Sequence, residues 1–369
     1  MRRLKIAFLT EFFYPHIGGC EKRFYEITRR LAAKNHDVHV FTIQYDDDLP
    51  TEEVIEGIKV HRYSHSQSYI SQDSFRSLEG ILRYSLSSFR RLRKTDFELY
   101  YSNQWPMLHS IFVKPVATPL IQEWCEVWDR PLRAIIMQKL LRKVGDYHVA
   151  VSEFTKQRLI NNLKINPEKI VLITNGVDTA KFGGDNKKIW GRIIYVGRLV
   201  PHKRVELLID AFREVKKKIP QAELHIIGSG LCIQSIKNKA KGIENCFIHG
   251  FLPEKQMIEL VKTAWMFVLP SEREGSGISS MEAMAAGVPF ITLDYPNNAA
   301  KELCQLDCGV LVQPNEKAIA SAIIQLFNDP PRWQKLSNHA LNTAKKHEWN
   351  TIANQMETFF QTVVNNPEK

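Results

Sequence analysis

The chain has 369 residues, of which 44% are hydrophobic and 24% charged, and its formal net charge is +10. This length exceeds what one ordinary hydrophobic core organises, so we expect two domains of about 150 to 200 residues each. The composition is that of a soluble globular protein, and no segment reaches the roughly 20 consecutive apolar residues that span a bilayer.

The positive charge is spread along the chain. Residues 1–180 hold 26 Lys and Arg against 21 Asp and Glu, so half of the net charge lies on each side of residue 180. A basic stripe interleaved with aromatic residues is missing, which argues against a nucleic-acid-binding protein. The six cysteines, at positions 20, 125, 232, 246, 304 and 308, form no CxxC pair and are typical of buried thiols in a reducing compartment.

The first apolar run, residues 6–9, follows Arg2 and Arg3 as it would in a signal peptide, but Glu11 interrupts it after a few residues. We therefore expect the first strand of a sheet rather than a leader. With no candidate membrane span, we expect a cytoplasmic protein, or one that is peripheral on the cytoplasmic face of the membrane.

Short apolar strands alternate with helical stretches up to residue 174, a pattern that predicts a doubly wound parallel sheet. The expected strands are residues 5–10, 37–45, 98–102, 119–123, 147–151 and 170–173. Polar, turn-rich residues at 175–178 and 183–188 then predict a connector.

One helical segment of this first half is strongly basic. Arg76, Arg83, Arg90 and Lys94 recur at intervals of seven, seven and four, which places them on one face, with apolar residues elsewhere around the helix. Such a helix can lie on an anionic lipid surface. The alternative is an ordinary solvated helix.

A second alternating series follows the connector. Its expected strands are residues 193–196, 223–227, 246–249, 266–269, 290–292 and 310–312. After residue 331 no strand pattern remains. The last predicted helix carries Trp349, Ile352, Met356 and Phe360 at spacings of three and four, so it needs a surface to pack on.

Two cations follow the strand at 193–196. Arg198 and Lys203 are five residues apart, after Gly197, at the carboxyl end of a buried strand. A planar guanidinium and a mobile ammonium there could hold a diphosphate between them.

Other familiar site patterns are missing. Gly228-Ser229-Gly230 follows a strand, but a lone GxG more often makes a tight strand-to-helix turn than a dinucleotide site, so a dehydrogenase is not expected. No cluster has zinc-ligand spacing, and Asp46-Asp47-Asp48 falls in a predicted surface loop rather than in a metal site. We expect no metal and no cofactor.

The most informative motif runs from Glu274 to Glu282. Two carboxylates flank a glycine-rich turn that follows the strand at 266–269 and opens an apolar helix near Ile278. Helix N–H groups there would face an anion, and Gly275 and Gly277 would let a phosphate approach closely. Carboxylates at two separate points suit sugar hydroxyls, so the motif predicts a sugar nucleotide. The alternative is an ordinary turn with solvated Glu side chains.

Taken together, these motifs resemble those of the retaining glycosyltransferases of family four. The matching residues are Pro15-His16-Ile17-Gly18-Gly19, Asn175-Gly176-Val177-Asp178, Gly197-Arg198 with Lys203, and Glu274 to Glu282 continuing to Pro289. The resemblance implies the GT-B fold, in which two Rossmann-like domains face a cleft. It implies an acceptor domain at 1–176, a donor domain at 177–346, and a C-terminal helix at 347–369 that packs back on the first domain.

The resemblance also implies roles for individual residues. Arg198 and Lys203 would clamp the donor diphosphate and stabilise the leaving group in place of a metal. Glu274 would bind the hydroxyls of the transferred sugar, and Glu282 those of the ribose. Backbone N–H groups would come from Gly18 and Gly19 and from Gly275, Ser276, Gly277 and Ile278. Phe251 is a candidate for lining the base pocket, with a buried core position as the alternative.

One position departs from the family pattern. Members commonly carry a histidine after the strand at 119–123, close to the reacting carbon, and Cys125 stands there in this chain. A neutral thiol cannot reproduce the hydrogen bonds of an imidazole. His109 could substitute for the missing histidine, although a lone histidine on an apolar helix is more often structural.

The resemblance therefore implies a retaining transferase that moves a hexose-type sugar from a nucleoside diphosphate to a hydroxyl acceptor. A lipid-linked acceptor and an anionic membrane surface are compatible with the basic helix. Two alternatives stay open: a nucleotide-sugar epimerase or sugar phosphorylase of the same fold, and a non-catalytic basic protein that binds nucleic acid or lipid.

Overall fold

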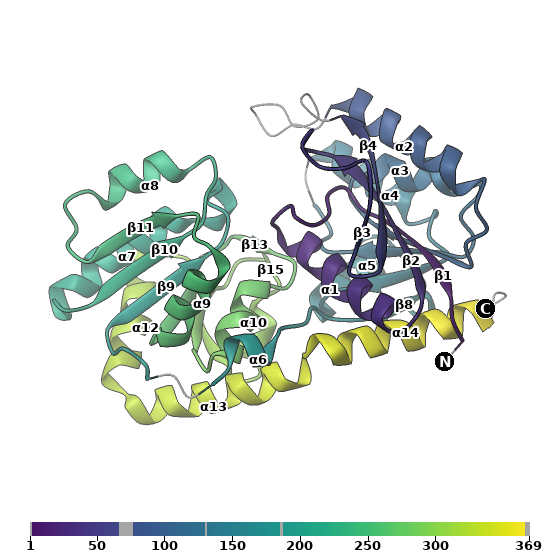
Figure 1. The fold of residues 1–369 in the computed structure, drawn as a ribbon. Helices are drawn as coiled ribbons and strands as arrows, with labels where there is room; N and C mark the ends of the chain where they lie inside the picture. Colours follow the sequence, from purple (N-terminus) through teal and green to yellow (C-terminus); the bar gives the residue numbers. More distant parts are fainter. Residues whose placement is uncertain (1, 66–76, 130, 185–186, 366–369) are drawn as a thin grey trace. The chain divides into compact units, whose positions relative to one another are not determined.

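The computed structural model describes residues 2–65, 77–129, 131–184 and 187–365 (Figure 1). The chain forms two compact units, Met1–Asn175 with Trp349–Lys369, and Gly176–Glu348. We call them unit 1 and unit 2 and describe each by itself. Arg76 of the predicted basic helix and residues 185–186 of the predicted connector lie outside the described residues.

Unit 1 is built on a sheet with the strand order β3-β4-β2-β1-β5-β6-β7-β8. Neighbouring strands are parallel except β3 and β4. The strands are β1 (Lys5–Leu9), β2 (Asp37–Gln44), β3 (Glu52–Ile55), β4 (Ile58–His65), β5 (Leu99–Asn103), β6 (Leu120–Trp124), β7 (Tyr147–Ala150) and β8 (Ile170–Leu172). All six expected strands are present, and the doubly wound sheet is confirmed.

The β3–β4 hairpin was not expected from the sequence. Its two-residue turn, Glu56-Gly57, has positive φ angles of 47° and 82°, which is the geometry of a hairpin turn that favours glycine. Ile55 on one side of this turn pairs with Ile58 on the other, and Val60 continues the alternation on β4.

The helices of unit 1 are α1 (Gly19–Ala33), α2 (Leu78–Leu92), α3 (Met107–Val113), α4 (Leu132–Leu141), α5 (Glu153–Asn161) and α14 (Trp349–Asn365). Helix α14 packs against α1 (Figure 1), and its buried side chains join the same core as strands β1 and β5. Phe360 contacts both Phe8 and Tyr101. The last helix therefore supplies part of the core of the first unit, as the amphipathic spacing required.

Unit 2 contains a parallel sheet with the order β11-β10-β9-β12-β14-β16. The strands are β9 (Arg192–Val196), β10 (Glu223–Ile227), β11 (Cys246–Gly250), β12 (Met266–Leu269), β14 (Phe290–Leu293) and β16 (Gly309–Val312), all as expected. The helices are α6 (Thr179–Phe182), α7 (Val205–Lys218), α8 (Ile233–Ala240), α9 (Glu254–Thr263), α10 (Ile278–Ala285), α11 (Lys301–Cys304), α12 (Glu316–Asn328) and α13 (Pro330–Lys346).

The order of strands locates the switch point of each sheet. In unit 1 the connections reverse direction between β1 and β5, and in unit 2 between β9 and β12. Ligands of doubly wound folds bind outside the carboxyl ends of the strands at these points. Within the described residues, no helix combines the length and apolar character needed to cross a bilayer.

Candidate functional site

The switch point of unit 2 brings together two residues that lie 71 positions apart. Lys203 ends a short 3₁₀ helix, Pro201–Lys203, after β9, and Glu274 follows β12. The Nζ atom of Lys203 lies 2.5 Å from Oε1 of Glu274, and the two side chains are only 15% and 9% exposed. The backbone N–H of Glu272 also donates to the carbonyl of His202 at 2.8 Å. The two loops are therefore held together at the strand ends.

Arg198 belongs to the same cluster, because its charge acts on the pKa of both Tyr195 and His202. The hydroxyl of buried Tyr195 donates to the carbonyl of Arg198 at 3.0 Å. Burial and the charge of Glu274 raise the pKa of Tyr195, and Arg198 opposes them. Burial, then Lys203, Arg273 and Arg198, lower the pKa of His202 to about 4. His202 is therefore neutral at pH 7, close enough to three cations and to Glu274 for their charges to act on it.

Sequence reasoning gave no role to Tyr195, His202 or Arg273. His202 stands directly before Lys203, so its place in the cluster could have been read from the sequence. The position of Arg273 near His202 depends on a two-residue strand, β13 (Arg273–Glu274), which pairs with β15 (Asn297–Asn298). Such a short pairing has no periodic signal.

This pairing also corrects the expected position of Glu274. The sequence predicts a loop residue, but the backbone of Glu274 is paired with Asn298, and its carbonyl accepts from the N–H of Ala299 at 3.0 Å. The short strand fixes the carboxylate more firmly than a loop would. Glu282, the second carboxylate of the motif, lies on α10 and is 7% exposed.

Helix α10 begins at Ile278, as predicted. Gly277 caps it with a φ of 69°, a left-handed conformation that other residues adopt only with strain. Gly275 and Ser276 form the turn before it and are half-buried. Donor binding by Gly275, Ser276, Gly277 and Ile278 at this helix start stays a prediction.

Gly228 and Gly230 pack against the backbone of the loop that follows β9. A Cβ atom on Gly228 would meet the carbonyl oxygen of Gly197 at 1.8 Å, and one on Gly230 would meet that of Leu199 at 2.4 Å. Leu199 in turn donates its N–H to Ser229 at 2.8 Å. The GxG turn thus packs against the loop that carries Arg198, and its interpretation as a tight turn is confirmed.

Phe251 follows β11 and is 61% exposed, so the buried core position considered for it is wrong. Gly250 precedes it with a φ of 71°. Leu231, after β10, is exposed to a similar extent, 64%. Two apolar side chains thus stand in solvent beyond neighbouring strands, and their use as a base pocket stays a prediction.

In unit 1 the loop after β1 leads to the expected glycines. Gly18 is the N-cap of α1, and Gly19 is its first residue. A Cβ on Gly18 would meet the carboxylate of Glu21 at 2.2 Å, and Glu21 pairs with His16 at 3.2 Å. A carboxylate therefore already lies beside the start of α1. Donor binding by Gly18 and Gly19 stays a prediction.

Cys125 directly follows β6. Its backbone N–H donates to Oε1 of Gln104 at 2.8 Å, and its thiol lies 3.9 Å from Oε1 of Glu123. A hydrogen bond with Cys20, then burial, raises the pKa of Cys125 well above the usual range of a thiol. Cys125 is therefore neutral at pH 7 and cannot act as a base.

His109 is fully buried on α3, and both of its ring nitrogens are engaged. Nε2 lies 2.8 Å from Oγ of Ser102, and Nδ1 faces the carbonyl of Pro106. Burial lowers the pKa of His109 to about 4. These contacts favour a structural role over substitution for the missing histidine.

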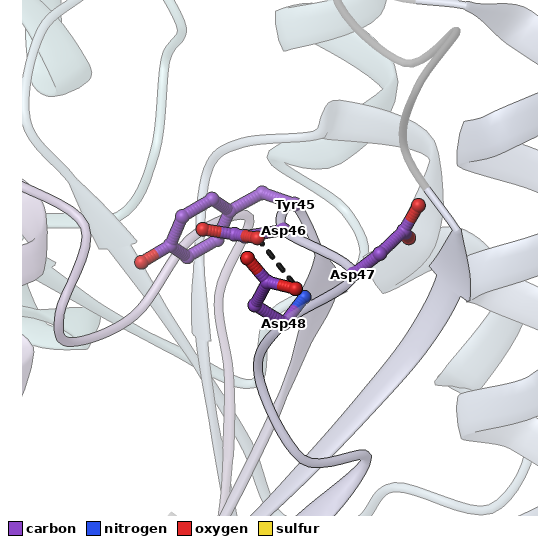
Figure 2. Close-up of a pocket in the computed structure, with 4 residues that line it drawn as sticks. All are labelled: Tyr45, Asp46, Asp47 and Asp48. Atoms are coloured by element: carbon purple, nitrogen blue, oxygen red, sulfur yellow. Dashed lines mark hydrogen bonds between the residues drawn. The ribbon is translucent and has the colours of Figure 1, made fainter.

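The predicted Asp46–Asp48 loop lines an open hollow of about 410 Å³ together with Tyr45. Figure 2 shows Tyr45, Asp46 and Asp48 close together, with Asp47 directed away, and the N–H of Asp48 donates to Oδ1 of Asp46 at 3.0 Å. Within the described residues, no three His, Cys, Asp or Glu side chains are grouped as metal ligands would be.

Comparisons with known proteins place this chain in a family. The model of "Glycosyltransferase Family 4" matches residues 17–181, and that of "Glycosyl transferases group 1" matches residues 182–347. One relative, a phosphatidylinositol N-acetylglucosaminyltransferase component from Arabidopsis thaliana, is 23% identical, over 97% of this chain and 82% of that protein.

Two solved structures share the fold. Sucrose-phosphate synthase from Thermosynechococcus elongatus has a TM-score of 0.85 and 19% identity, over 98% of this chain and 100% of that one. HepE of Anabaena in complex with UDP-glucose has a TM-score of 0.76 and 16% identity, over 98% and 100%. The two family models together cover nearly the whole chain, which therefore belongs to the group 1 glycosyltransferases and has the GT-B fold.

Proposed function

We propose that the protein is a retaining glycosyltransferase that moves a hexose-type sugar from a nucleoside diphosphate to a hydroxyl acceptor. The observation that carries this proposal is the contact between Lys203 and Glu274, with Arg198 beside them, at the switch point of unit 2. The structure of HepE with UDP-glucose supports a nucleotide sugar as the donor.

The cluster suits the chemistry of such a transfer. The diphosphate becomes more negative as the anomeric C–O bond breaks, and two fixed cations stabilise that charge without a metal. Glu274 accepts hydrogen bonds from sugar hydroxyls, and Glu282 from those of the ribose. The acceptor oxygen bonds to the anomeric carbon, and its proton passes to a phosphate oxygen of the donor, because Cys125 cannot take it.

A donor screen with product analysis tests the proposal. The protein is incubated with UDP-, GDP- and ADP-hexoses, with and without a hydroxyl acceptor. We expect free nucleoside diphosphate to appear only with the acceptor, and NMR to show the anomeric configuration of the donor in the product. Epimerised donor or sugar phosphate would instead support the alternative reactions. Salt-dependent binding to nucleic acid without donor affinity would support the non-catalytic alternative.

We further propose that the acceptor is reached at an anionic membrane surface, through helix α4 of unit 1. Leu132, Ile136 and Leu140 follow one another at intervals of four, on one face, and are 70%, 51% and 50% exposed. Residues 131–145 contain four Lys and Arg and no Asp or Glu. An exposed apolar row with basic neighbours has the chemistry of a lipid-surface helix.

Helix α2 shows a weaker version of the same pattern. Leu78 and Leu86 are exposed, as are Arg83 and Arg90, although Arg83 pairs with Glu79 at 2.5 Å. The lipid named in the Arabidopsis relative, phosphatidylinositol, supports an acceptor of this class.

Co-sedimentation with vesicles tests the membrane proposal. We expect the wild type to bind vesicles that contain an anionic lipid, and Ile136→Glu with Leu140→Glu to lose most of that binding. Each buried CH₂ contributes about 0.8 kcal/mol, and the added carboxylates are repelled by the surface. Val54→Glu, 68% exposed on β3, is the matched control. Equal binding of all variants, including charge reversals at Arg83 and Arg90, would contradict the proposal.

A further inference from the structure

Two cysteines that lie 105 positions apart meet in unit 1. Cys20 is in the first turn of α1, directly after Gly18 and Gly19, and Cys125 directly follows β6. Their sulfur atoms are 3.3 Å apart. Both residues are partly exposed, and Ile17 and Gly19 beside Cys20 are exposed to solvent. A small reagent can therefore approach the pair from this loop.

The fold holds each sulfur in place. The side chain of Gln104 accepts hydrogen bonds from the backbone N–H groups of Cys125 and Glu126, at 2.8 and 3.1 Å. The Nδ2 atom of Asn103 lies 3.7 Å from the Cys125 sulfur. On the other side, Cys20 is the second residue of α1, so the helix fixes its backbone. Fixed backbone positions therefore bring the two thiols close together.

We propose that Cys20 and Cys125 form an oxidation site, at which a peroxide converts the two thiols into a disulfide. The Cys20 thiol attacks one peroxide oxygen and becomes a sulfenic acid, and the O–O bond breaks to release one water. The Cys125 thiol then attacks the sulfur of Cys20, an S–S bond forms, and the hydroxyl leaves with the thiol proton as a second water. The peroxide is reduced, and the two thiols are oxidised.

The order of the two steps follows from the surroundings of the sulfurs. Cys125 shares a hydrogen bond with Cys20 beside the carboxylate of Glu123, and its raised pKa keeps it a neutral thiol. Cys20 lies in the first turn of α1, directly after a loop with exposed residues, so it is the thiol that a peroxide reaches first. Cys20 is therefore the attacking thiol, and Cys125 resolves the sulfenic acid. A disulfide needs about 2 Å between the sulfurs, so small side-chain movements suffice.

The other cysteines serve as an internal comparison. Cys304 and Cys308 are four positions apart, but Cys308 directs its thiol towards the carbonyl of Leu306 and Oγ1 of Thr343. Burial raises the pKa of Cys304 to about 12. These two thiols are expected to stay reduced under conditions that oxidise the first pair.

The disulfide would control sugar transfer, a consequence that rests on the proposed function. It would join the Gly18-Gly19 turn to the segment after β6, and it would replace the thiol that stands where the family resemblance places a histidine. Transfer should then fall on oxidation and return on reduction.

Peptide mapping of the reduced full-length protein tests the oxidation site independently of transfer. After a brief exposure to hydrogen peroxide, free thiols are blocked with N-ethylmaleimide, and the protein is digested without reduction. We expect a peptide pair linked through Cys20 and Cys125, and a fall from six to four blocked thiols. Cys304→Ser should leave that link unchanged, whereas Cys125→Ser should leave a sulfenic acid on Cys20 that dimedone traps.

Two results would overturn the proposal: wild-type protein that keeps all six thiols at a peroxide dose that oxidises a small dithiol, or a link between other cysteines. If the link forms but no donor supports transfer, the oxidation site stands and the proposed function fails. If transfer occurs and oxidation leaves it unchanged in the linked protein, only the regulatory consequence fails.

Discussion

Replacing Lys203 with Met should lower kcat/KM for sugar transfer by about 10² to 10³-fold, the usual effect of removing one fixed donor from a developing anion. The ammonium is held 2.5 Å from Glu274 in a nearly buried pair, so its position is set before any donor arrives. Lys203→Arg keeps the charge but not the shape and should retain part of the rate. Transfer rates and the affinity for nucleoside diphosphate are measured together.

A matched control separates this effect from a general loss of charge. Lys181 forms a surface pair with Glu254 at 2.6 Å in the same unit, so Lys181→Met should leave transfer unchanged. Thermal unfolding shows whether Lys203→Met still folds, because it leaves Glu274 without its partner. A folded Lys203→Met protein with wild-type kcat/KM would refute the diphosphate clamp.

The second large effect is expected in the core of unit 1. Arg23→Met should lower the free energy of unfolding of that unit by about 3–5 kcal/mol, because it leaves the buried carboxylate of Glu123 without its cation. Arg23 is 1% exposed, and its Nε atom donates to Oε2 of fully buried Glu123 at 2.7 Å. It also donates to the carbonyls of Ile173 and Thr174, at 2.9 and 2.6 Å. Tyr101 donates to the same carboxylate.

The double variant Arg23→Met with Glu123→Gln removes both charges and should recover part of the loss. Arg83→Met, which breaks an exposed pair with Glu79, should change stability by less than about 1 kcal/mol. Since the two units need not unfold together, hydrogen exchange in peptides that cover β6 is the appropriate measurement. A cost below about 1 kcal/mol for Arg23→Met alone would show that the pair contributes little.

Periodic elements could be predicted from the sequence, because their signal is local. The twelve expected strands all exist, and the helix at Ile278 begins where the glycine-rich turn ends. The β3–β4 hairpin was missed although Glu56-Gly57 marks its turn, since the flanking residues are only partly apolar. The strand that holds Glu274 could not have been seen, because two residues show no periodicity.

The site was predicted less completely than the fold. The approach of Lys203 to Glu274 follows from two neighbouring parallel strands, so the expected topology already placed both residues at one edge. The pair of Arg23 with Glu123 and the contact of Cys20 with Cys125 join positions that are 100 and 105 residues apart. Nothing in a single sequence links such positions, because their meeting depends on how a helix packs across several strands.

The packing of α14 against α1 has a consequence for biosynthesis. Trp349, Ile352, Met356, Phe360 and Val363 complete the core around β1, although they are made after the whole of unit 2. During translation, unit 2 can therefore reach its native state while unit 1 still exposes the apolar core residues that α14 covers. The half of the protein that leaves the ribosome first is the half that matures last, and a nascent chain stalled before residue 349 should need a chaperone.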